Sequence, residues 1–135
     1  MFDIGLLGAI INLNPESIMR YDYGSYKGYF AENFVLQELY SYGLNKVVTW
    51  FGRTSEIEFV LEINGDIIPV EVKSGFNTKA KSLQAFINKY SPVYSVKFTG
   101  NKFGFDNQKR IFNYPLYMTS KFPGNSGDSI YIKNL

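Results

Sequence analysis

An Asn-Gly pair at residues 64–65 is the feature that most constrains the fold of this chain. It lies between two runs of alternating residues in the stretch SEIEFVLEINGDIIPVEVKS, residues 55–74. Asn-Gly is the strongest short signal for a two-residue hairpin turn, because both turn positions need a positive φ. If Ile63 and Asp66 flank the turn, residues whose numbers sum to 129 lie opposite each other. The stretch therefore predicts an antiparallel hairpin with a defined register.

The alternation assigns the side chains of this hairpin to two faces. One face is apolar and is predicted to be core; it comprises Ile57, Phe59, Leu61, Ile63, Ile68, Val70 and Val72. The other face carries Glu56, Glu58, Glu71 and Lys73. In the predicted register Glu58 faces Glu71, and Glu56 faces Lys73. A bulge at Pro69, which cannot donate to a ladder, would shift this register by one residue.

The opposed pair Glu58 and Glu71 is unusual. It falls at a non-hydrogen-bonded position, where opposed Cβ atoms lie about 4.5–5.5 Å apart. Like charges there are destabilising unless one carboxylate is protonated, both reach water, or a cation lies between them. A hard cation such as Mg²⁺ suits two carboxylates, and Lys73 next to them can act on a bound water or a phosphate. The alternative from spacing alone is a solvated strand face with a weak Glu56–Lys73 surface pair.

Composition excludes several kinds of chemistry. The chain has 135 residues, of which 45% are apolar and 18% aromatic, so it is expected to be one folded domain. It has no Cys and no His, which excludes disulfides and His-based triads and leaves zinc without its usual ligands. The net charge of +2 is too small to indicate nucleic-acid binding by itself. An enzyme built from this chain would rely on carboxylates, lysines and a hard metal ion.

Targeting and nucleotide-binding signals are missing as well. No apolar run reaches the length of a membrane-spanning helix, and the absence of Cys fits a cytoplasmic protein. No GxxxxGK phosphate loop is present, so the chain contains no ATPase motif. Residues 1–11 predict a short apolar helix that begins without a cap, which suggests that the chain continues from something removed or that this helix docks on something absent.

The remaining periodicity predicts helices at residues 29–42 and 78–90 and strands at 46–52, 93–98 and 110–118. Pro115 marks the last of these as an edge strand. Residues 100–108 are predicted to be a turn-rich loop, and residues 130–132 a further short strand. Glu32 lies on the apolar stripe of the first long helix, where a charged group is rarely buried without a partner. The expected order is helix, three strands, helix, strand.

That order resembles the PD-(D/E)XK nuclease superfamily, with Glu32 in the first helix, Glu58 on the second strand and Glu71-Val72-Lys73 on the third. The spacing is most similar to the Holliday-junction resolvase and RecB-type branch. More narrowly, the chain resembles the C-terminal domain of unknown function found on bacterial and archaeal AAA-type ATPases. The strings that carry this resemblance are DIGLL (3–7), GYFAENFV (28–35), SEIEFV (55–60), IPVEVKSG (68–75), KSL (81–83), FG (103–104) and PLY (115–117).

The resemblance implies a restriction-endonuclease-like α/β fold. Its αβββαβ core is a mixed sheet with a three-strand antiparallel meander flanked by helices. It also implies a division of the chain. Residues 1–28 would be short helices and a loop leading from an ATPase part, 29–118 the nuclease-like domain, and 119–135 a glycine-rich tail.

The resemblance further implies metal-dependent hydrolysis of phosphodiester bonds in DNA. Glu58 and Glu71 would bind Mg²⁺ or Mn²⁺ with the carbonyl of Val72, and Glu32 would complete the site. Lys73 would orient or activate the attacking water. The strand position taken by Glu58 is usually Asp in that superfamily. The implied partner is an AAA-type ATPase, in cis or in trans.

Three functions follow from the sequence: a metal-dependent nuclease, a non-catalytic nucleic-acid-binding domain serving an ATPase, and a protein-interaction module. The second draws on basic residues that form either a phosphate track or an ordinary solvated surface, namely Lys79, Lys81, Lys97, Lys102, Lys109 and Arg110. The third draws on the apolar first helix and the many tyrosines. Salt dependence of binding would separate the first two, and size in solution with and without residues 1–13 would test the third.

Overall fold

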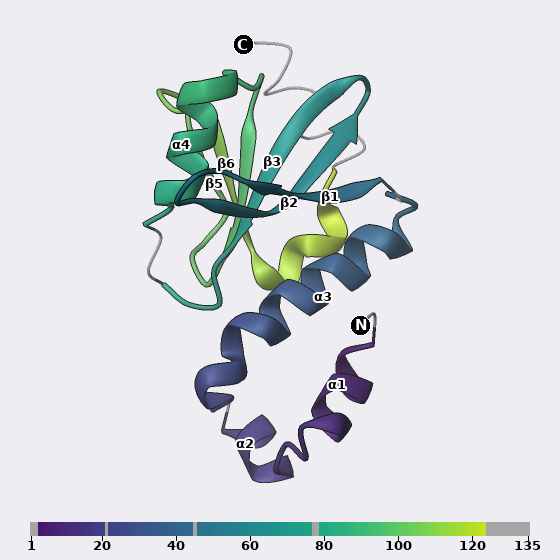
Figure 1. Ribbon diagram of the computed structural model, residues 1–135. Coiled ribbons are helices and arrows are strands. Elements are labelled where there is room, and N and C mark those ends of the chain that lie inside the picture. Colours follow the sequence, from purple (N-terminus) through teal and green to yellow (C-terminus); the bar gives the residue numbers. More distant parts are fainter. Residues whose placement is uncertain (1–2, 21, 45, 77–78, 124–135) are drawn as a thin grey trace.

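The computed structural model describes residues 3–20, 22–44, 46–76 and 79–123, which form a mixed α/β fold around one six-stranded sheet (Figure 1). The strands are β1 (Val47–Phe51), β2 (Glu56–Ile63), β3 (Asp66–Val72), β4 (Ser95–Thr99), β5 (Gly104–Asp106) and β6 (Ile111–Pro115), in the spatial order β1-β2-β3-β4-β6-β5. β1, β2 and β3 form an antiparallel meander. β4 runs parallel to both β3 and β6, and β5 is antiparallel to β6.

The helices lie on both sides of this sheet. The α-helices are α1 (Ile4–Ile10), α2 (Pro15–Met19), α3 (Lys27–Ser41) and α4 (Lys81–Tyr90), and the 3₁₀ helices are η1 (Gly24–Tyr26) and η2 (Leu116–Lys121). The order α3, β1, β2, β3, α4, β4 confirms the predicted αβββαβ core and its mixed sheet. None of the described helices has the length and apolar character needed to cross a membrane.

The hairpin turn forms as its sequence predicts. Asn64 and Gly65 have φ values of 53° and 90°, the positive values that a two-residue turn of this kind needs. Ile63 lies opposite Asp66 and Phe59 opposite Val70, which confirms the predicted register. The register does not shift at Pro69, which lies opposite Val60. The third strand therefore presents Glu71 on the predicted face.

A bulge in β2 corrects one prediction about the core. Val48 of β1 lies opposite Val60, but Trp50 lies opposite Ile57, so one residue of β1 faces two residues of β2, Glu58 and Phe59. A bulge of this kind interrupts the alternation of faces. Ile57 consequently packs with Val60 under α4, not on the face of Phe59. The placement of Ile57 on the Phe59 face was wrong because strict alternation does not continue through a bulge.

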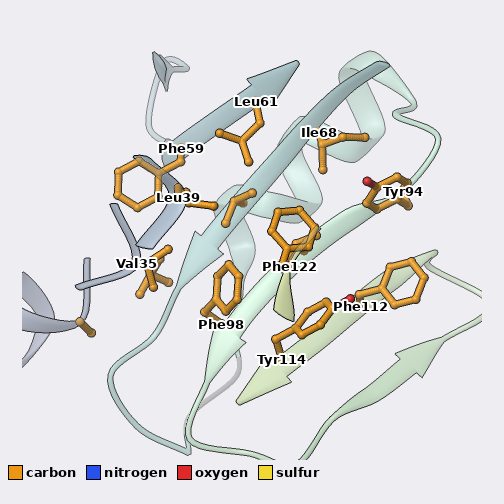
Figure 2. Packing of buried hydrophobic residues seen from close by; sticks show 14 residues of the cluster. Val35, Leu39, Phe59, Leu61, Ile68, Tyr94, Phe98, Phe112, Tyr114 and Phe122 are labelled. Carbon is orange, nitrogen blue, oxygen red and sulfur yellow. The ribbon is translucent and has the colours of Figure 1, made fainter. Parts of the chain in front are cut away.

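The larger core lies between α3 and one face of the sheet (Figure 2). Val35 and Leu39 of α3 are fully buried there against Val70, Val96 and Phe98 of β3 and β4. A smaller cluster under α4 covers part of the opposite face and comprises Ile57, Val60, Leu83, Phe86 and Ile111. Central strands are thus buried on both faces. The sequence-based alternative of a solvated second face is wrong for β3, where Glu71 is only 2% exposed.

The far side of the sheet also differs from expectation. Residues 104–106 form β5 at the edge, so β6 lies inside the sheet between β4 and β5. Pro115 is the last residue of β6, and the chain continues as η2 instead of as strand. The prediction that the first helix begins without a cap was wrong, because Leu6 N–H donates to Asp3 Oδ1 at 2.6 Å and Asp3 therefore caps α1. The strand expected at residues 130–132 lies outside the described residues, and the division into three parts stays a prediction.

Candidate functional site

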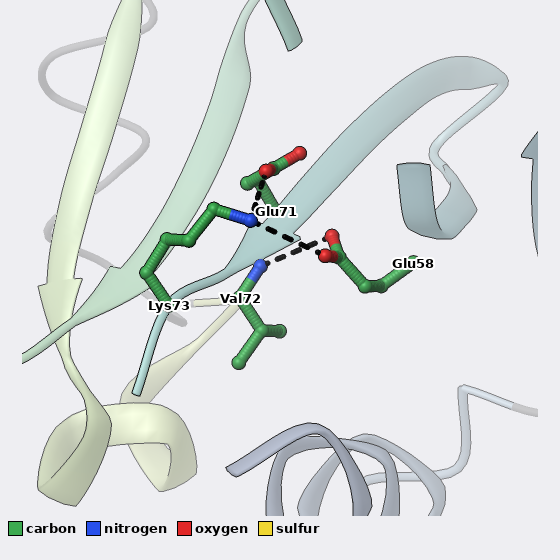
Figure 3. Close-up of polar contacts among 4 residues, drawn as sticks. All are labelled: Glu58, Glu71, Val72 and Lys73. Carbon is green, nitrogen blue, oxygen red and sulfur yellow. Dashed lines mark hydrogen bonds and ion pairs between the residues drawn. The ribbon is translucent and has the colours of Figure 1, made fainter. Parts of the chain in front are cut away.

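The hairpin opens at the end of β2 and β3 that carries the acidic residues. In the described structure the register pairs of β2 and β3 stop at Phe59 and Val70. Beyond that point Val72 N–H donates to Glu58 Oε2 at 3.3 Å, in place of a backbone acceptor (Figure 3). The carboxylate of Glu58 thus occupies the split between the strands. The bulge at Glu58 and Phe59 accounts for this split, because bulges bend a strand and increase its twist.

Lys73 joins the two carboxylates of the cluster. Its Nζ lies 2.5 Å from Glu71 Oε1 and 3.5 Å from Glu58 Oε1 (Figure 3). The side chains of Glu71, Glu58 and Lys73 are 3%, 18% and 33% exposed, so this is not a surface pair. A cation between Glu58 and Glu71 was one way in which their like charges could be tolerated, and in the structure the ammonium of Lys73 contacts both carboxylates. The alternative Glu56–Lys73 pair was wrong, because Lys73 pairs with Glu58 and Glu71 and Glu56 forms no ion pair in the described structure.

One oxygen of the cluster is left without a partner. Glu71 Oε2 is buried and accepts no hydrogen bond from the described residues. A buried acceptor in this state costs free energy and calls for an explanation, such as an ion or a water. Burial raises the pKa of Glu71, and the hydrogen bond from Lys73 opposes that rise. The orphaned oxygen is therefore the atom of this cluster that still lacks a hydrogen-bond donor or a cation among the described residues.

Lys73 stays protonated in this setting. Burial lowers its pKa, but the hydrogen bond to Glu71 and the charges of Glu71 and Glu58 raise it more, so the net shift is upward. A lysine in this state donates hydrogen bonds and does not accept a proton. Its chemistry at the site is therefore electrostatic.

Glu32 lies near the cluster without touching it. It is half-buried on α3, and it lines a groove of about 380 Å³ together with Leu7, Tyr29 and Phe59. Burial and the charge of Glu58 raise its pKa, and Lys73 opposes the rise. No hydrogen bond or ion pair joins Glu32 to the cluster in the part of the chain that the structure describes. The link between Glu32 and the cluster in this structure is therefore electrostatic.

The donor set fits a hard divalent cation that shares its shell with water. Nowhere in residues 3–20, 22–44, 46–76 and 79–123 do three or more acidic side chains lie close enough to hold a metal ion. Mg²⁺, however, is commonly bound by one or two carboxylates, with waters and substrate phosphates completing its shell. Glu58 and Glu71 supply two carboxylates, and Glu71 Oε2 is a buried oxygen still to be satisfied. The residues present therefore fit Mg²⁺ or Mn²⁺ in a water-rich shell.

A polar row extends from the cluster across the sheet. Glu71 lies beside Lys97 of β4, and Lys97 lies beside Asn113 of β6. Thr99 belongs to the same face, because its hydroxyl donates to Asn113 Oδ1 at 2.9 Å. Thr99 and Asn113 were not among the residues predicted from the sequence. A signal was present for Asn113, which interrupts a short run of apolar strand residues, but not for Thr99, which is the last residue of its strand.

The basic residues predicted to contact nucleic acid fall at different distances from this row. Lys97 is half-buried within it, and the charge of Lys109 acts on Lys97. The others are exposed: Lys79 and Lys81 near the start of α4, and Lys102 and Arg110 around β5 and β6. Their contact with nucleic acid stays a prediction.

The fold and the site together define a mixed α/β domain with a lysine-bridged carboxylate pair where its central hairpin splits. The chain belongs to the family described as Domain of unknown function (DUF4143), whose sequence profile matches residues 27–117. This match runs from the first residue of α3 into η2 and confirms the resemblance to a domain of unknown function. Searches of curated proteins and of solved structures gave no match.

Proposed function

We propose that this domain hydrolyses phosphodiester bonds in DNA with the help of Mg²⁺ or Mn²⁺. The observation that carries the proposal is the convergence of Glu58, Glu71 and Lys73 where β2 and β3 separate, with a buried oxygen of Glu71 unsatisfied. Perturbed carboxylates next to a charged lysine are typical of functional sites, because they cost stability where they occur. The resemblance to PD-(D/E)XK nucleases assigns the same three residues to catalysis.

Glu58 and Glu71 would hold the ion, with the Val72 carbonyl as a further oxygen ligand and Glu32 acting from α3. A bound divalent cation supplies a polarised phosphate and a water of lowered pKa. The chain itself supplies position. Val72 N–H holds the carboxylate of Glu58 at 3.3 Å, which limits its rotation. Placement of this kind matters because an error of about 1 Å can cost about 10²-fold in rate.

Lys73 would act on the phosphate. Its ammonium is protonated and lies within reach of both carboxylates. If Glu58 and Glu71 held a cation, the three donors of Lys73 would be available to a phosphate oxygen and to the attacking water. A donor preplaced where negative charge develops stabilises the transition state more than the ground state. An AAA-type ATPase, in cis or in trans, is the partner that the resemblance suggests for delivering DNA.

A second candidate function is non-catalytic binding of nucleic acid on behalf of an ATPase. It is favoured by the ammonium of Lys73, which already pairs with both carboxylates, and by the absence of a three-acid group among the described residues. In this function the cluster would be a structural ion pair. The polar row and its lysines would then carry the binding.

Calorimetric titration with Mn²⁺ separates the two functions. The proposal expects one saturable site in the wild type that is lost in Glu71→Gln and kept in Glu62→Gln, a control on the exposed part of β2. Cleavage of a labelled DNA should then require Mn²⁺ and disappear in Glu71→Gln. If Mn²⁺ binds neither the free protein nor its DNA complex, catalysis is excluded and the non-catalytic function replaces it.

A further inference from the structure

Lys97 is a charged residue at the centre of a strand whose other residues are buried. It lies in the middle of β4, between Val96 and Phe98, whose side chains are fully buried in the core under α3. Lys97 therefore points to the opposite face, the face of Glu71 and Asn113, its neighbours in register. The apolar cluster under α4 covers only the part of this face near Ile57, Val60 and Ile111.

The ammonium of Lys97 has no ion pair and no hydrogen bond in the part of the chain that the structure describes. The nearest carboxylate in register, Glu71, is already bonded through Oε1 to Lys73 at 2.5 Å. Burial and the charge of Lys109 lower the pKa of Lys97, whereas Asp106 and Glu71 oppose that shift. Burial and the charge of Lys109 disfavour the ammonium of Lys97 more than Asp106 and Glu71 favour it, so a bound anion would stabilise Lys97.

The residues beside Lys97, namely Thr99, Gly100 and Asn113, are held in place by hydrogen bonds. Asn113 Oδ1 accepts from the Thr99 hydroxyl at 2.9 Å, and Asn113 Nδ2 donates to the carbonyl of Lys102 at 2.8 Å. Gly100 N–H donates to the carbonyl of Gly75 at 3.0 Å, and a Cβ at Gly100 would lie 3.3 Å from that backbone. The loop after β4 is thus tied to the loop that follows Lys73. A site built on fixed strands and tied loops loses little entropy when a ligand binds.

We infer that Lys97 and Lys109 form a phosphate subsite that holds the sugar-phosphate backbone of a nucleic-acid strand next to the Glu58–Glu71–Lys73 cluster. The inference rests on the proposed function for the identity of the ligand. Neighbouring strands lie about 4.7–4.9 Å apart, so Lys97 stands one strand away from Glu71. A single anion bound at Lys97 would be repelled by the charge of Glu71. A strand with one phosphate at the carboxylates that would hold the metal ion, and the next phosphate at Lys97, would be stabilised at both places.

The test measures binding without turnover. Fluorescence anisotropy would follow a labelled oligothymidylate of about 16 nucleotides over a series of KCl concentrations with a chelator present. The same series would be measured on Glu71→Gln, in which the proposed metal site is removed. The variants are Lys97→Met, Lys97→Arg and the control Lys121→Met; Lys121 is an exposed lysine of η2, which contacts α3 on the other side of the sheet. Circular dichroism and thermal unfolding would verify that each variant folds.

Lys97→Met is expected to bind several-fold more weakly, and its plot of log affinity against log salt should become shallower by about 0.7, the loss of one phosphate contact on a single strand. Lys97→Arg should keep the slope, and Lys121→Met should match the wild type. An unchanged slope for Lys97→Met overturns the subsite, and if the wild type still cleaves DNA with Mn²⁺ the proposed function stands without it. If the wild type binds no oligonucleotide at the lowest salt, the subsite falls, and cleavage of DNA with Mn²⁺ decides the proposed function separately.

Discussion

The two faces of the central strands β3 and β4 differ in the kind of side chain that they carry. Toward α3, Val70, Val72, Val96 and Phe98 are each at most 3% exposed and pack in one apolar cluster. On the same two strands and at the residue that follows β3, the side chains that alternate with them are charged or polar: Glu71, Lys73, Lys97 and Thr99. The first face gains free energy from every side chain, because apolar burial carries no unpaired group. The second holds an orphaned carboxylate oxygen and an unpaired ammonium, which cost stability and are expected where a protein binds something.

Removal of a large side chain from the apolar face should have the largest effect. Phe98 is fully buried and stacks near Tyr114 and Phe122, with ring centroids 5.7 and 5.8 Å away. Phe98→Ala should lower the free energy of unfolding by about 3–5 kcal/mol, because it removes the ring and leaves a cavity. Urea unfolding measures this. Tyr117→Ala, at a residue 79% exposed, should change it by less than about 0.5 kcal/mol; equal losses would show that the two environments do not differ as described.

On the polar face, loss of Lys73 should have the next largest effect, and it should depend on pH. Lys73→Met leaves the nearly buried Glu71 without its hydrogen-bond donor. We expect a loss of about 1–3 kcal/mol at neutral pH. The loss should shrink in acid, where Glu71 is protonated and no longer needs a counter-charge. Urea unfolding at both pH values measures it, and a loss independent of pH would contradict the ionised pair.

Replacement of Lys97 should stabilise the protein, which is the opposite of the effect expected for Lys73. Lys97→Met removes a half-buried cation that has no ion pair among the described residues and that lies near Lys109, while a long side chain is kept. We expect the protein to become more stable by about 0.5–2 kcal/mol, as is common when a residue kept for function is replaced. Thermal unfolding of Lys97→Met and Lys97→Arg would compare loss of the charge with retention of it. Destabilisation by Lys97→Met alone would mean that Lys97 serves the fold.

The smallest effect concerns Glu71 and the pH profile of stability. Burial raises the pKa of Glu71 in the folded protein above its ordinary value of 4.5. The folded state therefore holds this proton more tightly than the unfolded chain does. The resulting stabilisation is fully present below pH 4.5 and is lost as the pH rises through the folded pKa. In a urea-unfolding series over pH, Glu71→Gln should make this decline in stability smaller, whereas the control Glu62→Gln should leave it unchanged. Part of the decline should persist in Glu71→Gln, because the pKa of Glu32 is also raised.

Local chemistry made much of the fold predictable. The turn at Asn64 and Gly65 depends only on which residues tolerate a positive φ, so the register of β2 and β3 followed from the sequence. Alternation from that turn placed Glu58, Glu71 and Lys73 on one face, and the resemblance added Glu32. The bulge at Glu58 and Phe59 could not be read in the same way. It depends on how β1 pairs with β2, and no short-range pattern specifies that pairing.

Distant parts of the chain explain what sequence reasoning missed. Pro115 predicted an edge strand, because proline cannot donate to a ladder, yet β5 pairs alongside β6 and takes the edge. The position of Lys97 between Glu71 and Asn113 needs the parallel crossover through α4, which brings together strands far apart in sequence. Glu32 stands apart from the cluster because the packing of α3, not its helical periodicity, sets that separation. Turn chemistry and alternation act between neighbours along the chain, so they specified the hairpin and the cluster. Strand order, the bulge and the lysine beside the cluster arise from long-range packing, and only the folded structure could show them.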